Sequence, residues 1–162
     1  MKYITPKLLK MQDSDDPNEV ERANAIIEKN AIEYEKHYQN IKNNFSKEFL
    51  SVYESGYRFH DWNIESIAYY TSKNRKNDRV KLKLSYCDAC CTLTFKHVSI
   101  FRMDSFDENC DSYYIGDKDI YYADEWNFLS NGLIKYEMLS LCFSKIEIIC
   151  KSISLKQKKL IV

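Results

Sequence analysis

The chain has 162 residues, of which 44% are hydrophobic and 30% charged, and this composition fits one globular domain with a hydrophobic core. It contains only three glycines and none of the glycine motifs that cradle phosphates, which argues against the enzymes that need such a loop. Lysine plus arginine and aspartate plus glutamate both number 24, and the resulting zero net charge argues against a general nucleic-acid binder.

The distribution of apolar residues also bears on the compartment. The first residues form no long apolar run, and no stretch approaches the roughly 18 apolar residues of a membrane span. We therefore expect a cytoplasmic protein that contacts no membrane and needs no cofactor. Its six cysteines are then expected to be reduced thiols.

Two helices are predicted first along the chain. Apolar residues spaced three and four apart predict a long helix that begins after Asp16 and runs towards Phe45. Asp16 is a suitable N-cap, and Pro17 suits the first helical position. A short second helix is predicted between Ser46, as its N-cap, and Gly56, as its C-terminal stop.

The pattern then changes to the alternation of strands. Residues 63–72, 79–86 and 91–101 are predicted to form three strands joined by short polar links, which indicates an antiparallel meander, and residues 120–129 are a further candidate strand. Two longer strands, 133–143 and 144–155, are expected to close the sheet.

These elements predict an α+β fold in a single domain spanning residues 1–162. A long N-terminal helix and a short second helix, within residues 1–56, should pack on a mostly antiparallel sheet of about five to six strands, within residues 57–155. Residues 156–162 are expected to be a basic tail.

The two signs of charge are segregated along the sequence. Residues 73–83 hold six lysines or arginines and one aspartate, whereas residues 104–125 hold eight acidic residues and one lysine. One face of the protein is therefore expected to be basic and another acidic.

Three short motifs carry a resemblance to a known group of proteins. They are the opening Met1–Tyr3, the step Phe59-His60-Asp61 into a strand, and the aromatic-acidic Tyr122–Glu125 before two closing strands. With the charged N-terminal helix, these features resemble an uncharacterised bacterial family. The resemblance implies a small cytoplasmic α+β protein and no assigned activity. The chain as a whole also resembles small α+β immunity proteins that neutralise polymorphic bacterial toxins.

The pair His60 and Asp61 lies between two aromatic residues where the helical part meets the first strand. Metal-dependent phosphohydrolases use such a pair together with a separate histidine and a later aspartate. Adjacent residues of a strand point to opposite faces, so they do not form one site. We interpret the pair as a structural corner in which Asp61 hydrogen-bonds a turn and His60 packs against its aromatic neighbours.

The segment Tyr86–Cys91 offers a possible metal site. Cys87 and Cys90 have the spacing of half a zinc site, and His97 is a further candidate ligand. A complete zinc site needs four ligands, and no second pair with suitable spacing follows. The alternative is a hairpin turn flanked by small buried thiols. Because no βαβ pattern surrounds the motif, thiol redox chemistry is disfavoured.

The acidic segment with its interleaved aromatic residues is the main candidate for function. Carboxylates steer encounter with a basic partner and aromatic rings supply rigid contact area, although such a segment is most often a solvated loop. The residues expected to bind a partner are Asp104, Asp107, Glu108, Asp111, Tyr113, Tyr114, Asp117, Asp119, Asp124, Glu125 and Trp126.

We therefore expect a non-enzymatic protein-binding domain, in its most concrete form an immunity protein whose carboxylates occupy the basic cleft of a toxin. The alternatives are a zinc-stabilised domain or metal-dependent hydrolase using Cys87, Cys90, His97 and His60, and a structural module that pairs its strands across a homodimer. The sequence leaves open whether the protein is a monomer or a homodimer.

Overall fold

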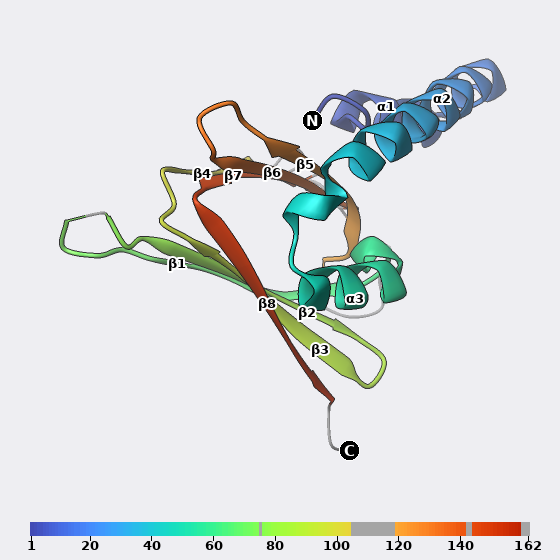
Figure 1. Cartoon of the computed structure of the whole chain (residues 1–162). Coiled ribbons are helices and arrows are strands. Elements are labelled where there is room, and N and C mark those ends of the chain that lie inside the picture. Colours follow the sequence, from blue (N-terminus) through green and yellow to red (C-terminus); the bar gives the residue numbers. More distant parts are fainter. Residues whose placement is uncertain (75, 105–118, 142–143, 160–162) are drawn as a thin grey trace.

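The computed structural model describes residues 1–74, 76–104, 119–141 and 144–159. This part of the chain forms three α-helices and two antiparallel sheets of four strands each (Figure 1). The α+β class predicted from the sequence is confirmed.

The helices begin where the sequence supplies caps. They are α1 (Pro6–Gln12), α2 (Pro17–Ile41) and α3 (Lys47–Ser55), with single 3₁₀ turns at η1 (Lys42–Asn44) and η2 (Tyr57–Phe59). The side chains of Thr5, Asp16 and Ser46 each accept a hydrogen bond from a backbone N–H of the first turn. The predicted long and short helices are thus α2 and α3, and α1 is an additional helix. None of the helices in the described ranges combines the length and the apolar content that a membrane span requires.

The described residues form eight strands, of which three, at residues 79–86, 89–96 and 145–150, alternate between buried and more exposed side chains as their sequences predict. The eight strands are β1 (Asn63–Tyr70), β2 (Arg79–Tyr86), β3 (Ala89–Lys96), β4 (Ile100–Asp104), β5 (Tyr121–Phe128), β6 (Ile134–Ser140), β7 (Lys145–Cys150) and β8 (Ser152–Lys159). One sheet has the order β1-β2-β3-β8 and the other the order β4-β7-β6-β5.

Two bent strand pairs connect the sheets at one corner. β3 passes into β4 and β7 passes into β8, so that the β3–β8 ladder continues as the β4–β7 ladder. At the bend, Lys151 N donates to Lys96 O (3.1 Å) and Ser99 N donates to Ile149 O (2.8 Å). The backbone hydrogen bonding therefore continues around the corner.

The starts of β1 and β5 connect the sheets at a second place. Tyr121 N donates to Trp62 O (2.8 Å), Ile64 N donates to Asp119 O (2.8 Å), and Asp61 N donates to Tyr121 O (3.0 Å). These bonds anchor the segment that enters β1 against β5.

The strand count differs from the expected single sheet of about five to six strands. The predicted strands 91–101 and 144–155 each bend and contribute one strand to each sheet, β3 and β4 from the first and β7 and β8 from the second, so the described residues contain eight strands. The predicted basic tail is also partly strand, because Lys156 pairs with Thr92 and Lys158 with Cys90 in β8.

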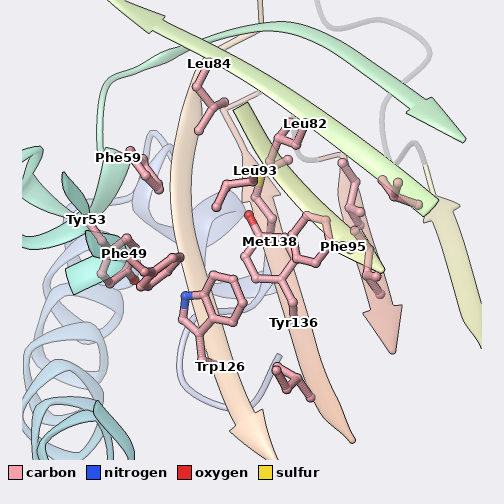
Figure 2. Close-up of a cluster of buried hydrophobic side chains, with 14 of the residues drawn as sticks. Phe49, Tyr53, Phe59, Leu82, Leu84, Leu93, Phe95, Trp126, Tyr136 and Met138 are labelled. Atoms are coloured by element: carbon pink, nitrogen blue, oxygen red, sulfur yellow. The ribbon is translucent and has the colours of Figure 1, made fainter. Parts of the chain in front are cut away.

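Aromatic side chains fill the space between the sheets and α3. The ring of Trp126 lies 4.4 Å from that of Tyr136 and 5.4 Å from that of Phe49, measured between centroids. Figure 2 shows Phe49 and Tyr53 meeting Trp126 and Tyr136 from the helical side. Burying such rings stabilises the fold by roughly 1.5–3 kcal/mol each. This core holds α3 in place, whereas α1 and most of α2 extend beyond the sheets (Figure 1).

Candidate functional site

A surface groove of about 710 Å³ opens between the end of α3 and the hairpin that joins β2 to β3. We call it the aromatic groove. Its lining residues are Val52, Ser55, Gly56, Tyr57, His60, Asp61, Trp62, Tyr86, Ala89 and Gln157.

The turn that follows α3 shapes one wall of the groove. Tyr57, Arg58, Phe59 and Asp61 all have positive φ, between 51° and 67°. Each such residue costs roughly 1–2 kcal/mol of backbone strain. The turn persists because Phe59 is fully buried in the core and Asp61 N is bonded to Tyr121. Strain of this kind is concentrated at functional sites, which makes the turn a candidate.

His60 and Asp61 lie in this turn, as the corner interpretation predicted. The expectation that they point apart is wrong, because it assumed strand geometry. In the left-handed turn His60 Nδ1 lies 2.9 Å from Asp61 Oδ1. Their side chains are 51% and 66% exposed, so water screens the pair.

Aromatic rings form the remaining walls. Trp62 and Tyr86 stack with their centroids 5.9 Å apart, and outside the groove the ring of Tyr122 lies 5.3 Å from that of His60. Tyr57 is 83% exposed, the highest value among the large hydrophobic residues of the described chain that lie at the surface. The groove thus presents one carboxylate, one imidazole and open aromatic faces to solvent.

Three residues predicted to bind a partner are instead buried. Asp124 lies in the core and accepts hydrogen bonds from Tyr53 Oη (2.6 Å), Tyr121 Oη (2.5 Å) and Trp126 Nε1 (2.7 Å). Burial raises the pKa of Asp124 to about 6, and the three donors counteract part of that rise. Trp126 itself is fully buried. These two residues are core components, since the alternation of β5 turns them inward.

Glu125 is also buried, and it holds the start of the chain. Its carboxylate accepts the backbone N–H groups of Lys2 (2.6 Å), Tyr3 (2.6 Å) and Ile4 (3.2 Å). The neighbouring Glu137 accepts the amino group of Met1 at 2.6 Å. Two of the motifs behind the family resemblance, the opening residues and the aromatic-acidic strand, are thus in direct contact.

The other predicted partner-binding residues are divided between the surface and the undescribed segment. Asp104 is exposed at the end of β4, and Asp119 is half-buried with its carboxylate accepting from Ile120 N (2.9 Å). The remaining six lie outside the described residues: Asp107, Glu108, Asp111, Tyr113, Tyr114 and Asp117.

The proposed zinc ligands do not converge. Cys87 lies in the two-residue turn of the β2–β3 hairpin and Cys90 just after it, which agrees with the predicted hairpin; the expected burial of these thiols is wrong, because Cys87 is exposed and Cys90 half-buried. His97 follows the opposite end of β3, roughly 20 Å away for a strand of this length. Within the described ranges no three metal-binding side chains come together.

Sequence reasoning missed the aromatic groove as a whole. Tyr86 of β2 and Gln157 of β8 are 71 positions apart in the sequence. Both line the groove because β2 and β8 pair with opposite sides of β3. Local signals existed for His60 and Asp61, which the sequence singled out between two aromatic residues, and for Tyr57, an aromatic residue directly after the helix stop at Gly56.

Comparisons with known proteins add little to this geometry. No family model and no curated protein matches the chain. Among solved structures, an uncharacterized protein from Neisseria gonorrhoeae is similar over 60% of this chain and 92% of that chain, with 13% sequence identity and a TM-score of 0.32.

Proposed function

We propose that the protein is a non-enzymatic protein-binding domain whose aromatic groove receives a basic side chain of a partner protein. The observation that carries the proposal is the exposed carboxylate of Asp61 beside the open ring of Tyr57. The proposed binding site is therefore acidic and aromatic, as was expected of residues 104–126, but other residues form it.

The groove supplies both groups that a lysine or arginine side chain prefers. Aromatic faces attract a cation through the ring quadrupole, at about 0.5–2 kcal/mol per contact. The carboxylate of Asp61 adds a charge-assisted hydrogen bond, since His60 occupies only one of its oxygens. The apolar floor formed by Trp62 and Ala89 suits the methylene stem of such a side chain.

Solvent exposure of the His60–Asp61 pair favours binding over catalysis. Catalytic acids and bases work in sites that exclude water, where their mutual interaction is strong. Here both side chains are more than half exposed, and the groove is open to solvent. A pair in this setting is suited to recognition.

Selection from a phage-displayed random peptide library tests the proposal. We expect the selected peptides to share a lysine or arginine flanked by apolar residues. In fluorescence anisotropy with these peptides, Asp61→Lys and the double variant Tyr57→Ala/Tyr86→Ala should each weaken binding at least tenfold, because they remove the carboxylate and two of the rings.

The control variants change matched residues outside the groove. Glu33→Lys on α2 and Tyr70→Ala on β1 alter an exposed carboxylate and an exposed ring, and they should leave peptide affinity unchanged. Selected peptides without a basic residue, or equal losses in the groove and control variants, would refute the proposed function.

A toxin domain with a basic cleft is the most specific partner that this proposal includes. Its test is co-expression with a toxin encoded by a neighbouring gene. Wild-type protein should protect the host cell, and Asp61→Lys should protect it less, whereas Glu33→Lys should protect it fully.

A further inference from the structure

The outer face of the sheet β1-β2-β3-β8 carries an excess of positive charge. We call it the basic face. Its cationic residues are Arg79, Lys81 and Lys83 from β2, Lys96 from β3, and Lys156 and Lys158 from β8.

The sheet register places these residues on one surface. In an antiparallel pair, residues opposite each other point to the same face. Arg79 pairs with Lys96, and the row through Lys83 continues through Thr92 to Lys156. Their neighbours along β2 and β3 point inward and are buried. The basic face is therefore the solvent side of the sheet, opposite the core and the aromatic groove.

The positive charge of this face is not balanced by carboxylates of the described residues. None of the six cationic side chains takes part in an ion pair with them. The one carboxylate of the outer strand β1, Glu65, accepts a hydrogen bond from Ser85 Oγ. The zero net charge of the chain thus conceals a surface on which six cationic side chains outnumber the one carboxylate of β1.

A small pocket of about 200 Å³ lies at one end of the basic face. It is lined by Asn77, Arg79, Lys96 and His97. His97 Nδ1 lies 2.7 Å from Lys76 O, and since a carbonyl only accepts, this nitrogen carries the hydrogen. A guanidinium, an ammonium and an amide thus line one concavity, and together these donors suit a phosphate group.

We propose that the basic face binds single-stranded nucleic acid, with one phosphate in the pocket beside Arg79, Lys96 and His97. The sugar-phosphate chain then crosses the sheet along the lysines of β2 and β8. The ring of Tyr70, half exposed at the edge of the face, is available to stack on a base.

The spacing and composition of the face favour this ligand over an acidic protein. Alternate residues of a strand lie about 7 Å apart, comparable to successive phosphates of an extended single strand. Between the lysines lie threonine and serine side chains such as Thr92, Thr94 and Ser154. Protein interfaces instead depend on clustered aromatic or aliphatic anchors, and this face offers the single ring of Tyr70.

Fluorescence anisotropy with labelled 20-nucleotide oligo-dT and oligo-rU tests the proposal. We expect binding at 50 mM KCl that weakens roughly 50-fold at 200 mM KCl if four phosphates are contacted. Lys81→Glu/Lys83→Glu and Arg79→Ala/Lys96→Ala should each weaken binding at least tenfold. Comparison of the two oligonucleotides shows whether DNA or RNA is preferred.

The control is Lys29→Glu/Lys36→Glu, which makes the same change in net charge as Lys81→Glu/Lys83→Glu but on exposed positions of α2, and it should leave the affinity unchanged. Absence of oligonucleotide binding at 50 mM KCl would overturn the proposal. An equal loss in the α2 variant, or equally effective competition by poly-glutamate, would also overturn it, because each would show general attraction of anions.

Discussion

At the residue scale, the most unusual group is the buried carboxylate of Asp124. It sits among three aromatic donors, and Tyr136 Oη donates in turn to Tyr121 Oη at 3.0 Å. Such a network fixes the relative positions of α3, β5 and β6, because Tyr53 donates from α3, Tyr121 and Trp126 belong to β5, and Tyr136 donates from β6. The cost of burying the charge appears as the raised pKa of Asp124.

Replacement of Asp124 by asparagine should change the pH dependence of stability. Between the ordinary pKa of 3.8 and the folded value of about 6, the folded protein retains a proton that the unfolded chain has lost. Stability from this group therefore falls as pH rises through that window, by roughly 3 kcal/mol. Urea unfolding from pH 4 to pH 7 should show this fall for wild type relative to Asp124→Asn.

The exposed Asp15 provides the comparison for this experiment. Asp15→Asn should follow the wild-type pH profile, since it removes a carboxylate that water already solvates. Parallel profiles of wild type and Asp124→Asn between pH 4 and pH 7 would show that Asp124 ionises normally in the fold.

At the element scale, α2 protects the open edge of β5. Tyr34 Oη accepts from Trp126 N (3.1 Å), and His37 Nε2 donates to Trp126 O (2.9 Å). Both backbone groups would otherwise be unpaired on the side of β5 away from β6. Edge strands left open invite pairing with other chains, and here two helix side chains take that role.

The variant Tyr34→Phe tests this role of α2. The variant leaves the Trp126 amide without its acceptor, which costs about 1–3 kcal/mol of unfolding free energy. Hydrogen exchange followed by NMR should show faster exchange of the Trp126 amide than in wild type. The exposed Tyr57→Phe is the matched control and should change neither quantity; an unchanged Trp126 exchange rate in Tyr34→Phe would contradict the role given to α2.

Glu125→Gln should loosen the N-terminal segment. The amide keeps one oxygen acceptor where the carboxylate serves three backbone N–H groups, and hydrogen bonds to a charged acceptor contribute about 1.5–3 kcal/mol each. Limited trypsin digestion should cut at Lys7 and Lys10 of α1 faster than in wild type. Glu33→Gln on α2 should digest as wild type does, and the same result for Glu125→Gln would mean that α1 is held by other contacts.

The elements were predictable where the signal is local. Caps at Asp16 and Ser46 and the alternation of β2 and β3 depend on neighbours in sequence, and they fold as expected. The bend at Lys151 depends on pairing between strands that are distant in sequence, and the two-residue alternation of apolar residues does not predict such pairing.

The candidate site was predicted less well for the same reason. The sequence favours a surface position for Glu125, because its hydrogen-bond partners are not close in sequence. They are the backbone N–H groups of Lys2, Tyr3 and Ile4, more than 120 positions away. The aromatic groove needs a left-handed turn of four non-glycine residues, and contacts distant in sequence stabilise that backbone: the burial of Phe59, the bond from Asp61 N to Tyr121 and the ion pair of Arg58 with Glu35.

At the scale of the whole molecule, the two sheets share their bent strands and their core. Phe95 from one sheet packs on Tyr136 from the other with centroids 4.9 Å apart, and α3 contacts β8 of the first sheet and Trp126 of the second. If either sheet unfolded, the inner face of the other sheet would be exposed to water. This arrangement favours cooperative unfolding as one unit.

Two single-tryptophan variants test that cooperativity. Trp126→Phe leaves Trp62, which reports on the turn into β1, and Trp62→Phe leaves Trp126, which reports on the sheet β4-β7-β6-β5. In each variant, urea unfolding followed by fluorescence should coincide with unfolding followed by far-UV circular dichroism, although Trp126→Phe should be the less stable because it loses the bond to Asp124. A fluorescence midpoint for Trp62 well below the dichroism midpoint would show that the sheet β1-β2-β3-β8 opens independently, and the chain would then contain two folding units.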